Sequence, residues 1–314
     1  PGWEPMNKKE CLMEFESVAD VQERLEAVDY IASREIATVV FLAFATGKPI
    51  MVEGPAGAGK TELARALSRC LGREKIRLQC YEGLDEAKAL YEWEYAKQLL
   101  YTQMIKEKIN DLIAGSLSIA EAVERIAEQE DAFFSERFLL ARPLLQAITA
   151  DQPVVLLIDE VDKSDPEFEA FLLELLSEFQ VSIPEIGLKK ARHIPLVILT
   201  SNNYRDMSDA LKRRCIHLYI DYPQPELEKR ILSLKLPGIE ERLVEKLVAM
   251  VNRIREMDLR KRPCISETLD WAQALMVLQA DDLSPEIVSE TLSVICKYRA
   301  DTQMVRDRMD TLFS

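Results

Sequence analysis

Short apolar runs alternate with longer helical repeats along the first two thirds of the chain. The apolar runs stand in "KPIMVEG", "KIRLQC", "PVVLLIDE", "LVILTSN" and "CIHLYID". Each is short and bounded by polar or turn residues, which is typical of buried strands. The first is followed by a glycine-rich turn and a helical pattern from Thr61 to Leu71, closed by Gly72, before the second strand. This order of strand, turn, helix and strand predicts an α/β fold with a parallel sheet.

Helical periodicity dominates two further stretches of this part. Apolar positions between Asp20 and Thr46 recur at helical spacing, which predicts two helices. From Glu86 to about Ala147 the pattern is nearly all helical, with a capping box from Ser118 to Glu121. Because this is far more helix than one strand-to-strand crossover needs, we expect an insertion at about residues 97–135.

A helix and a hairpin lie between the last predicted strands, and the pattern becomes entirely helical after them. Asp165 and Pro166 begin a helix with a strict apolar stripe, and "VSIPEIGLKKARHIP" predicts a β-hairpin. The prolines from Pro223 to Pro225 predict a hinge, after which every apolar repeat is helical, with one helix starting at Ser284. We therefore divide the chain into an N-terminal helical segment (1–28), an α/β core (29–222) and a helical lid (223–314).

The composition of the chain limits the classes of partner that it is expected to bind. The 314 residues carry a formal net charge of -14, a field that repels nucleic acid and anionic membranes. No apolar run approaches the roughly 20 residues that a transmembrane helix needs, so none is expected. The six cysteines form no CxxC pair and the chain starts with no apolar signal segment, which favours a cytoplasmic protein with reduced thiols.

The clearest chemical motif is "GPAGAGKT", from Gly54 to Thr61. It fits G-x-x-x-x-G-K-[ST], in which backbone amides face phosphate oxygens, the lysine reaches the β and γ phosphates and the threonine binds Mg²⁺. The motif stands between a predicted strand and a helix, as this mechanism requires. It predicts binding of ATP or ADP with Mg²⁺, with Lys60 and Thr61 in these roles.

Two acids end the strand "PVVLLIDE", at the edge where α/β sheets bind ligands. Asp159 is placed to hold Mg²⁺, directly or through water. Glu160 is placed to orient or deprotonate the water that attacks the γ-phosphate. Acids after an apolar run are weak evidence alone, but a phosphate-binding loop in the same chain strengthens the interpretation.

Two more polar positions follow the next strand. Asn202 ends "VILTSN" and is placed to contact the γ-phosphate and the water, with Asn203 as the alternative. Arg213 and Arg214 end a short predicted helix in "SDALKRRC". They are either surface charges or arginine fingers offered to the ATP of a neighbouring subunit.

These four elements, in this order, resemble those of AAA+ ATPases. Their amino-acid sequences resemble the MoxR family, nearest the CoxD-type accessory ATPases of carbon monoxide dehydrogenase. The resemblance runs from about Val18 to Gln279. Its most specific stretches include "LQCYEGLDEAKALYEWEY", "LLIDEVDKSDPEFEAFLLELLSEFQVSIPEIG" and "TSNNYRDMSDALKRRCIHLYIDYP". It implies an AAA+ P-loop NTPase core whose parallel strands lie in the order 5-1-4-3-2, with a small helical lid.

The resemblance also assigns site residues. It implies sensor 1 at Asn202, the arginine finger at Arg214, alone or together with Arg213, and a pore-facing hairpin at Val181 to His193. The expected nucleotide contacts are Gly54, Pro55, Ala56, Gly57, Ala58, Gly59, Lys60, Thr61, Glu62 and Asp159, with Tyr30 and Ile31 near the adenine. One position departs from many relatives: Thr268 stands where they have the sensor 2 arginine, so Arg260, Lys261 or Arg262 replaces it, or the lid is weakly coupled to the γ-phosphate.

The implied function is an ATP-driven chaperone that matures a metalloenzyme. The family's members are described as acting in rings, here expected to be hexamers, with a partner that bears a von Willebrand factor A domain. The client implied here is a molybdenum hydroxylase such as carbon monoxide dehydrogenase. His193 and His217 are read as structural, so any metal other than Mg²⁺ belongs to the client.

Two rival functions stay open from the residues alone. A nucleotide-gated scaffold would bind ATP with little turnover, and Thr268 at the sensor 2 place is the feature that favours it. A DNA-associated AAA+ motor would call for a basic stripe or an added helix-turn-helix module, and the acidic balance speaks against it.

Overall fold

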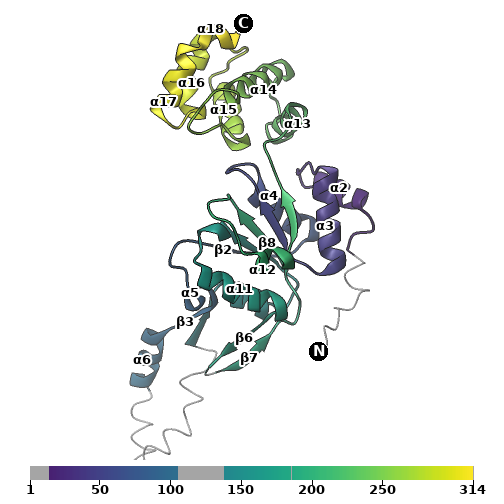
Figure 1. Cartoon of the computed structure of the whole chain (residues 1–314), viewed down its shortest axis with the longest axis vertical. Helices are drawn as coiled ribbons and strands as arrows, with labels where there is room; N and C mark the ends of the chain where they lie inside the picture. The colour runs from purple at the N-terminus through teal and green to yellow at the C-terminus, as the bar shows by residue number, and fades with distance from the viewer. Residues whose placement is uncertain (1–13, 105–137, 185, 314) are drawn as a thin grey trace, which may run out of the picture.

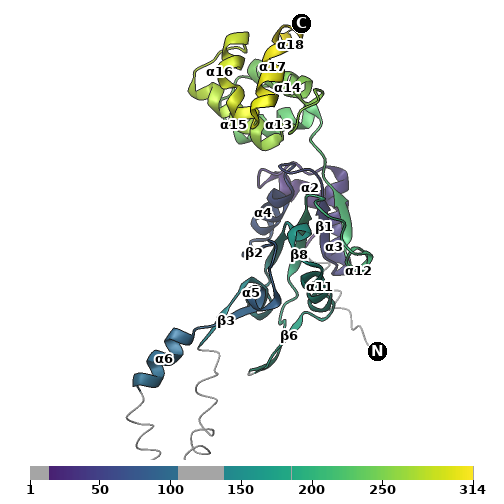
Figure 2. The same cartoon turned by 60° about the vertical axis from the view of Figure 1, so that its left-hand side comes forward.

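The computed structural model describes residues 14–104, 138–184 and 186–313, and it has three groups of elements (Figure 1). A five-stranded parallel sheet with helices on both faces forms the middle. Helices α13 to α18 form a separate group above it, joined by an extended segment after the last strand. Helix α6 (Tyr95–Met104) extends away from the sheet on the side opposite that group (Figure 2). In the described residues, no helix has the length and apolar character that crossing a membrane requires.

The central sheet has the order β2-β5-β8-β1-β9, with every neighbouring pair parallel. Its strands are β1 (Ile50–Glu53), β2 (Lys75–Gln79), β5 (Val155–Asp159), β8 (Leu196–Ser201) and β9 (Ile216–Tyr219). Counted in chain order among these five alone, the order is 2-3-4-1-5, which is 5-1-4-3-2 from the other edge. The predicted fold class and strand order are therefore confirmed.

Alternate residues of each strand bury against opposite helical layers. Leu156 and Ile158 of β5 pack into the cluster formed with α5 (Glu86–Leu90), α10 (Pro143–Thr149), α11 (Pro166–Glu178) and α12 (Asp209–Arg214). Val155 and Leu157 of the same strand pack into the cluster formed with α2 (Val18–Glu26), α3 (Arg34–Thr46) and α4 (Lys60–Leu71). Because helices cover both faces of the sheet, every position of such a strand is apolar, and the strand reads as a continuous apolar run.

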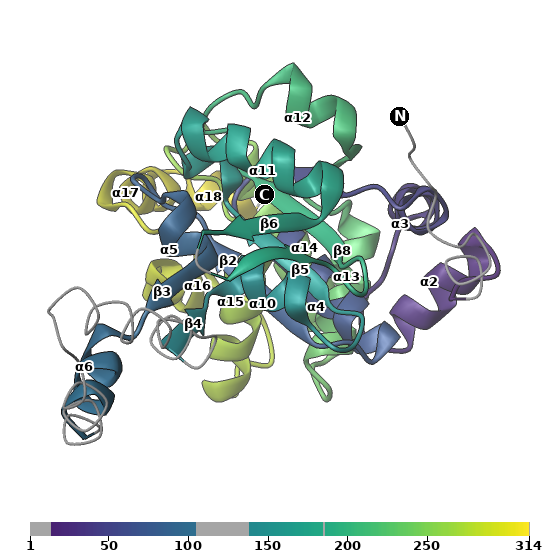
Figure 3. The ribbon, with the colours of Figure 1, turned by 90° about the horizontal axis from the view of Figure 1, so that it is seen from below.

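Two small antiparallel pairs lie outside this sheet. The predicted hairpin is present as β6 (Gln180–Ile183) and β7 (Gly187–Lys190), and it projects below the sheet toward the viewer in Figure 3. The second pair is β3 (Tyr91–Trp93) with β4 (Leu139–Ala141).

The second pair corrects the sequence analysis, which made the stretch from Glu86 to about Ala147 nearly all helical. Three-residue strands show too few positions for a period of two, and their pairing joins Tyr91 to Ala141 across a long insertion. The helical expectation was right for α5, α6 and α10. Most of the insertion expected at 97–135, including the capping box at Ser118, falls outside the described residues.

The C-terminal helices have a hydrophobic core of their own. They are α13 (Pro225–Lys235), α14 (Glu241–Arg255), α15 (Ile265–Val277), α16 (Pro285–Ile295), α17 (Arg299–Asp307) and α18 (Met309–Phe313). Trp271 is fully buried at their centre, and its Nε1 donates to Thr291 Oγ1 at 2.7 Å. The expectation that α16 starts at Ser284 is confirmed, since the Ser284 side chain accepts from the Ile287 amide.

Candidate nucleotide-binding and hydrolysis site

The glycine-rich loop joins β1 to α4 at the carboxyl edge of the sheet. Gly59 precedes the helix with φ +98°, and no side chain caps the first turn. The free amides of a helix N-terminus attract anions, so this end of α4 is suited to a phosphate group.

Close approach explains two of the loop glycines. A Cβ on Gly54 (φ +149°) would lie 2.0 Å from the carbonyl oxygen of Ile220, in the segment that follows β9. A Cβ on Gly57 (φ +77°) would lie 2.0 Å from Cys264 Sγ, in the C-terminal helical group. The loop is therefore held between the sheet edge and the helix cap at Cys264.

Lys60 lies under this loop with only 5% of its surface exposed. Its Nζ donates to the carbonyl oxygens of Gly54 at 2.8 Å and Pro55 at 2.7 Å. Burial lowers the pKa of Lys60, and the negative charges of Asp162, Asp159 and Glu160 oppose that shift. The ammonium group is thus bound by two carbonyl oxygens of the loop, and the charges of the three carboxylates favour its protonated form.

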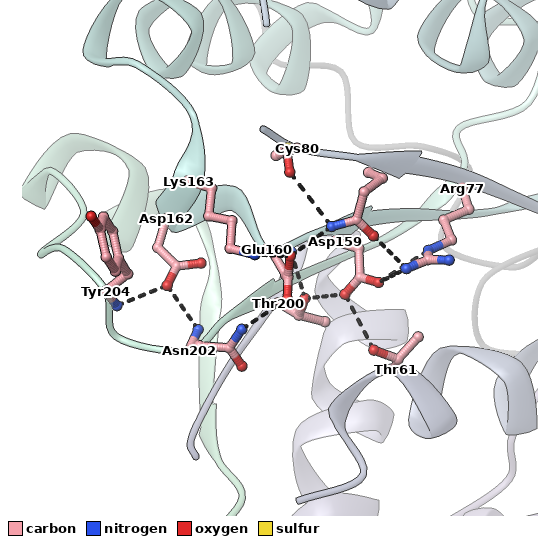
Figure 4. A network of polar contacts seen from close by, with 11 residues as sticks. Thr61, Arg77, Cys80, Asp159, Glu160, Asp162, Lys163, Thr200, Asn202 and Tyr204 are labelled. Atoms are coloured by element: carbon pink, nitrogen blue, oxygen red, sulfur yellow. Dashed lines mark hydrogen bonds and ion pairs between the residues drawn. The ribbon is translucent and has the colours of Figure 1, made fainter. Parts of the chain in front are cut away.

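Asp159 is the buried carboxylate at the end of β5 (Figure 4). Its Oδ1 accepts from Thr61 Oγ1 at 3.2 Å and from Thr200 Oγ1 at 2.5 Å. Its Oδ2 accepts from Arg77 Nε at 3.0 Å and Nη2 at 2.6 Å. The hydroxyl and carboxylate oxygens of Thr61 and Asp159 form the kind of hard oxygen pair that Mg²⁺ prefers.

Glu160 follows with a left-handed backbone (φ +55°). Its Oε1 accepts from Asn202 Nδ2 at 3.1 Å, while its Oε2 accepts from Gln79 Nε2 at 2.8 Å and Lys163 Nζ at 2.6 Å. The backbone amide of Glu160 donates to Thr200 Oγ1 at 2.9 Å. A non-glycine residue in this conformation persists where its surroundings fix it, and here two neighbouring strands do so.

The structure brings together most of the residues expected at the nucleotide. Thr61, Asp159, Glu160 and Asn202 lie at one edge of the sheet, where hydrogen bonds join Thr61 to Asp159 and Asn202 to Glu160. Lys60 lies beside them, bound to carbonyl oxygens of the loop. Asn203 has φ +60°, and its amide turns back to Ser201 Oγ at 3.0 Å. Asn202, and not Asn203, is therefore the residue whose side chain reaches Glu160.

Tyr30 and Ile31 lie between α2 and α3, both half-buried. Burial, together with the charge of Glu62 in the first turn of α4, raises the pKa of Tyr30. Tyr30 packs against the hydrophobic cluster that includes Leu63 and Leu67 of α4, the helix that starts at the glycine-rich loop.

Arg213 and Arg214 are exposed at the end of α12, and no hydrogen bond or ion pair of the described residues joins them to Asp159 or Glu160. Arg214 Nε donates to Ser177 Oγ at 2.9 Å. Arg213 has no partner within the ranges that the structure describes. Of the two, Arg213 is the one whose guanidinium is not already engaged.

Thr268 is fully buried in α15, where its Oγ1 donates to Glu228 Oε1 at 2.8 Å. It therefore does not face a ligand. Of the three cations expected as substitutes for sensor 2, two are engaged: the Arg260 guanidinium lies 4.2 Å from the Tyr298 ring centroid, and Lys261 Nζ donates to Glu267 at 2.6 Å. Arg262 is exposed and has no partner in the described parts of the chain.

Sequence reasoning missed the groups that surround the two acids. They are Arg77, Gln79, Asp162, Lys163 and Thr200. A weak signal existed for Arg77 and Gln79, because they are the alternating polar residues of an otherwise apolar strand ending at the ligand edge. Thr200 likewise lies on β8 two residues before Asn202.

The chain is similar to several known proteins. Residues 33–186 match the family model of the AAA ATPase domain. The uncharacterized protein SH1500 of Staphylococcus haemolyticus is 23% identical over 273 residues, covering 85% of this chain and 86% of its own. The uncharacterized protein SAB1265c of Staphylococcus aureus is 24% identical over 241 residues, covering 75% and 78%.

Among solved structures, the Thermotoga maritima RuvB Holliday junction branch migration motor aligns with a TM-score of 0.45 at 17% identity, covering 87% of this chain and 69% of that one. The sheet order and the match to the family model point to one conclusion. The chain has the α/β fold of an AAA+ P-loop NTPase core, and its residues 33–186 are similar to the AAA ATPase domain.

Proposed function

We propose that this protein hydrolyses ATP with Mg²⁺ and uses the cycle to remodel a client protein. The observation that carries the hydrolysis is the contact between Glu160 and Asn202, at 3.1 Å, beside the Thr61–Asp159 pair. A carboxylate base, an amide that orients it and an oxygen pair for the cation are the parts that γ-phosphate hydrolysis requires.

The chain's own groups divide this work. The amides at the start of α4 and the Lys60 ammonium bind the phosphates. To do so, Lys60 must exchange its carbonyl partners, Gly54 and Pro55, for phosphate oxygens. Thr61 and Asp159 would hold Mg²⁺, and the cation would supply positive charge that offsets the charge of the phosphates. Glu160 accepts the proton of the attacking water, and Asn202 sets the direction of its carboxylate.

Two side chains bind one carboxylate oxygen of Glu160. Gln79 and Lys163 both bind its Oε2, and the Lys163 contact is an ion pair at 2.6 Å. A base held in this way must be released before it can act on water. We therefore expect slow hydrolysis by the isolated protein and faster hydrolysis when a neighbour or partner shifts these contacts.

The more specific proposal is a ring-forming chaperone of the MoxR type. It rests on the resemblance of the motifs and on the exposed arginines at the end of α12, which have no use at their own subunit's P-loop. Arg213 is the better candidate for a contact in trans, because Arg214 would first lose its bond to Ser177. The β6–β7 hairpin projects from the body (Figure 2), which suits a client contact.

A von Willebrand factor A domain partner and a molybdenum hydroxylase client complete this proposal. Both come from the resemblance of the motifs alone. They specify which proteins to add to the assay.

One observation favours a second candidate, a nucleotide-gated scaffold. Thr268 is sealed in the helical group, so the sensor 2 place offers no cation to the γ-phosphate. Glu160 is also ion-paired with Lys163. A protein that binds ATP and hydrolyses it very slowly would show the same two features.

Steady-state hydrolysis separates the two. We would compare wild type with Lys60→Ala, Glu160→Gln and the control Glu167→Gln, an exposed acid on α11, alone and with the proposed partner and client. Loss of a general base costs about 10²–10⁴-fold, so Glu160→Gln should lose at least about 100-fold in kcat while still binding ATP. Lys60→Ala should lose nucleotide binding, and Glu167→Gln should match wild type.

Two outcomes decide against parts of the proposal. Tight ATP binding by wild type without turnover under any condition would leave the scaffold. Light scattering that stays monomeric with ATP at high protein concentration would remove the ring and the role of Arg213 in trans.

A further inference from the structure

Asp162 is a buried acid of the site that none of the expected roles uses. It lies in the 3₁₀ turn Val161–Lys163, two residues after Glu160, and is 1% exposed. Its Oδ2 accepts from the backbone amide of Asn202 at 2.9 Å and from that of Tyr204 at 2.8 Å. Figure 4 shows this carboxylate facing the end of β8, on the far side of Glu160 from Asp159.

The two amides stand on either side of a constrained residue. Asn203 has φ +60°, a conformation that residues other than glycine rarely adopt. Its own amide donates to Ser201 Oγ at 3.0 Å, so it takes no part in binding the carboxylate. Asp162 therefore clamps both ends of this turn and leaves the strained residue between them.

The clamp lies next to the chemistry. The backbone amide of Asn202 is held by Asp162, and the side-chain amide of the same residue donates to Glu160 Oε1 at 3.1 Å. The rotation of the Asn202 side chain depends on where its backbone is fixed. The contact of Asp162 with the Asn202 backbone therefore influences the orientation of the Glu160 carboxylate, the proposed base.

We infer that Asp162 is a positioning residue for hydrolysis, which orients Asn202, and through it Glu160, by clamping the turn at the end of β8. The inference rests on the proposed hydrolysis of ATP. It assigns no contact between Asp162 and the substrate.

A second feature bears on the charge of this group. Asp162 Oδ1 is buried without a hydrogen-bond partner in the described residues. Burying an oxygen without a hydrogen-bond partner costs free energy, so an apolar side chain would serve better here if packing were the only role of this residue. Its negative charge acts on Lys60, where it opposes the lowering of the pKa that burial causes.

The experiment needs variants that separate the clamp from the charge. Asp162→Ala removes both, whereas Asp162→Asn keeps one oxygen that can accept both amides and loses the charge. The matched control is Asp301→Ala in α17. Asp301 is 2% exposed and its two oxygens also accept backbone amides, those of Arg260 at 2.9 Å and Lys261 at 3.2 Å, but it lies in the helical group.

Hydrogen exchange tests the clamp without any activity. In Asp162→Ala the amides of Asn202 and Tyr204 should exchange at least about tenfold faster than in wild type, because each lost acceptor exposes its donor to water. Asp162→Asn should stay near wild type, and Asp301→Ala should leave these amides unchanged. Unchanged exchange in Asp162→Ala overturns the clamp.

Kinetics test the positioning. Asp162→Ala should lose about 10–100-fold in kcat with nucleotide affinity within threefold, and Asp162→Asn should recover most of it. The double variant Asp162→Ala/Asn202→Ala should be no slower than Asn202→Ala, since both act through the same amide. Multiplicative losses, or an equal loss in Asp301→Ala, overturn the positioning role.

The outcomes keep the two proposals apart. If wild type hydrolyses no ATP with any partner, the proposed function fails and the kinetic part of this inference fails with it, while the exchange result still decides the clamp. If Asp162→Ala does not fold, Asp162→Ser, whose hydroxyl can accept one amide, takes its place in both measurements.

Discussion

Asp159 in the α/β core and Glu228 in the C-terminal helices are both buried carboxylates paired with an arginine, but their surroundings differ. Glu228 receives Arg255 Nη1 at 2.6 Å, Arg255 Nη2 at 2.8 Å and the hydroxyl of Thr268, and the Arg255 side chain is only 8% exposed. The arginine partner of Asp159 is Arg77, whose side chain is 50% exposed.

The difference shows which pair can exchange its partners. Every charge of the Glu228 pair is enclosed and satisfied inside one helical group, so nothing can replace a partner without unfolding it. Asp159 lies at the ligand edge of the sheet, beside the phosphate-binding loop, and water reaches its arginine. A carboxylate–guanidinium pair is thus locked inside the fold in one region and remains open to a ligand in the other.

The largest expected effect is on the enclosed pair. Glu228→Ala leaves the Arg255 guanidinium buried without its carboxylate, which typically costs about 3–5 kcal/mol. A urea titration should show this loss in the free energy of unfolding of the C-terminal helices. Glu226→Ala, which removes an acid with an 83% exposed side chain on the same helix, is the control and should change it by less than about 0.5 kcal/mol. A loss below about 1 kcal/mol for Glu228→Ala would contradict the comparison.

A smaller effect is expected from the hydroxyl in the same network. Thr268→Val removes the donor to Glu228 and keeps the shape, so the free energy of unfolding should fall by about 1–2 kcal/mol. Hydrolysis should stay within about twofold of wild type, because Thr268 faces the helical core. A tenfold loss of kcat at unchanged stability would show instead that this residue acts on the nucleotide.

The smallest effect on stability is expected at the open pair. Arg77→Gln should change the free energy of unfolding by less than about 1 kcal/mol, since a half-exposed ion pair contributes little. The matched change Arg255→Gln should cost several times more in the same titration. Equal losses for the two variants would erase the distinction between the regions. The Mg²⁺ concentration for half-maximal hydrolysis should move only in Arg77→Gln, because only Asp159 is expected to hold the cation.

Local pattern was sufficient for most elements of the fold. The five sheet strands were readable as short apolar runs bounded by polar or turn residues. Helix α11, which begins at Pro166, and the β6–β7 hairpin were readable from helical spacing and from turn residues. The β3–β4 pair was not, because its strands have three residues each and are joined across an insertion. The division into three domains and the roles of the site residues stay predictions.

The sequence by itself determined that a strand, a glycine-rich turn and a helix would form a phosphate-binding loop, and that acids would end a neighbouring strand. These features depend on residues next to one another in the chain, so composition and spacing suffice to predict them. Only the tertiary structure decided which groups hold Glu160 and Asn202. Gln79 is 81 residues from Glu160, and Asn202 is 42 residues from it. They meet because the parallel strands β2, β5 and β8 are neighbours in the sheet, and strand order places side chains together that no local period connects.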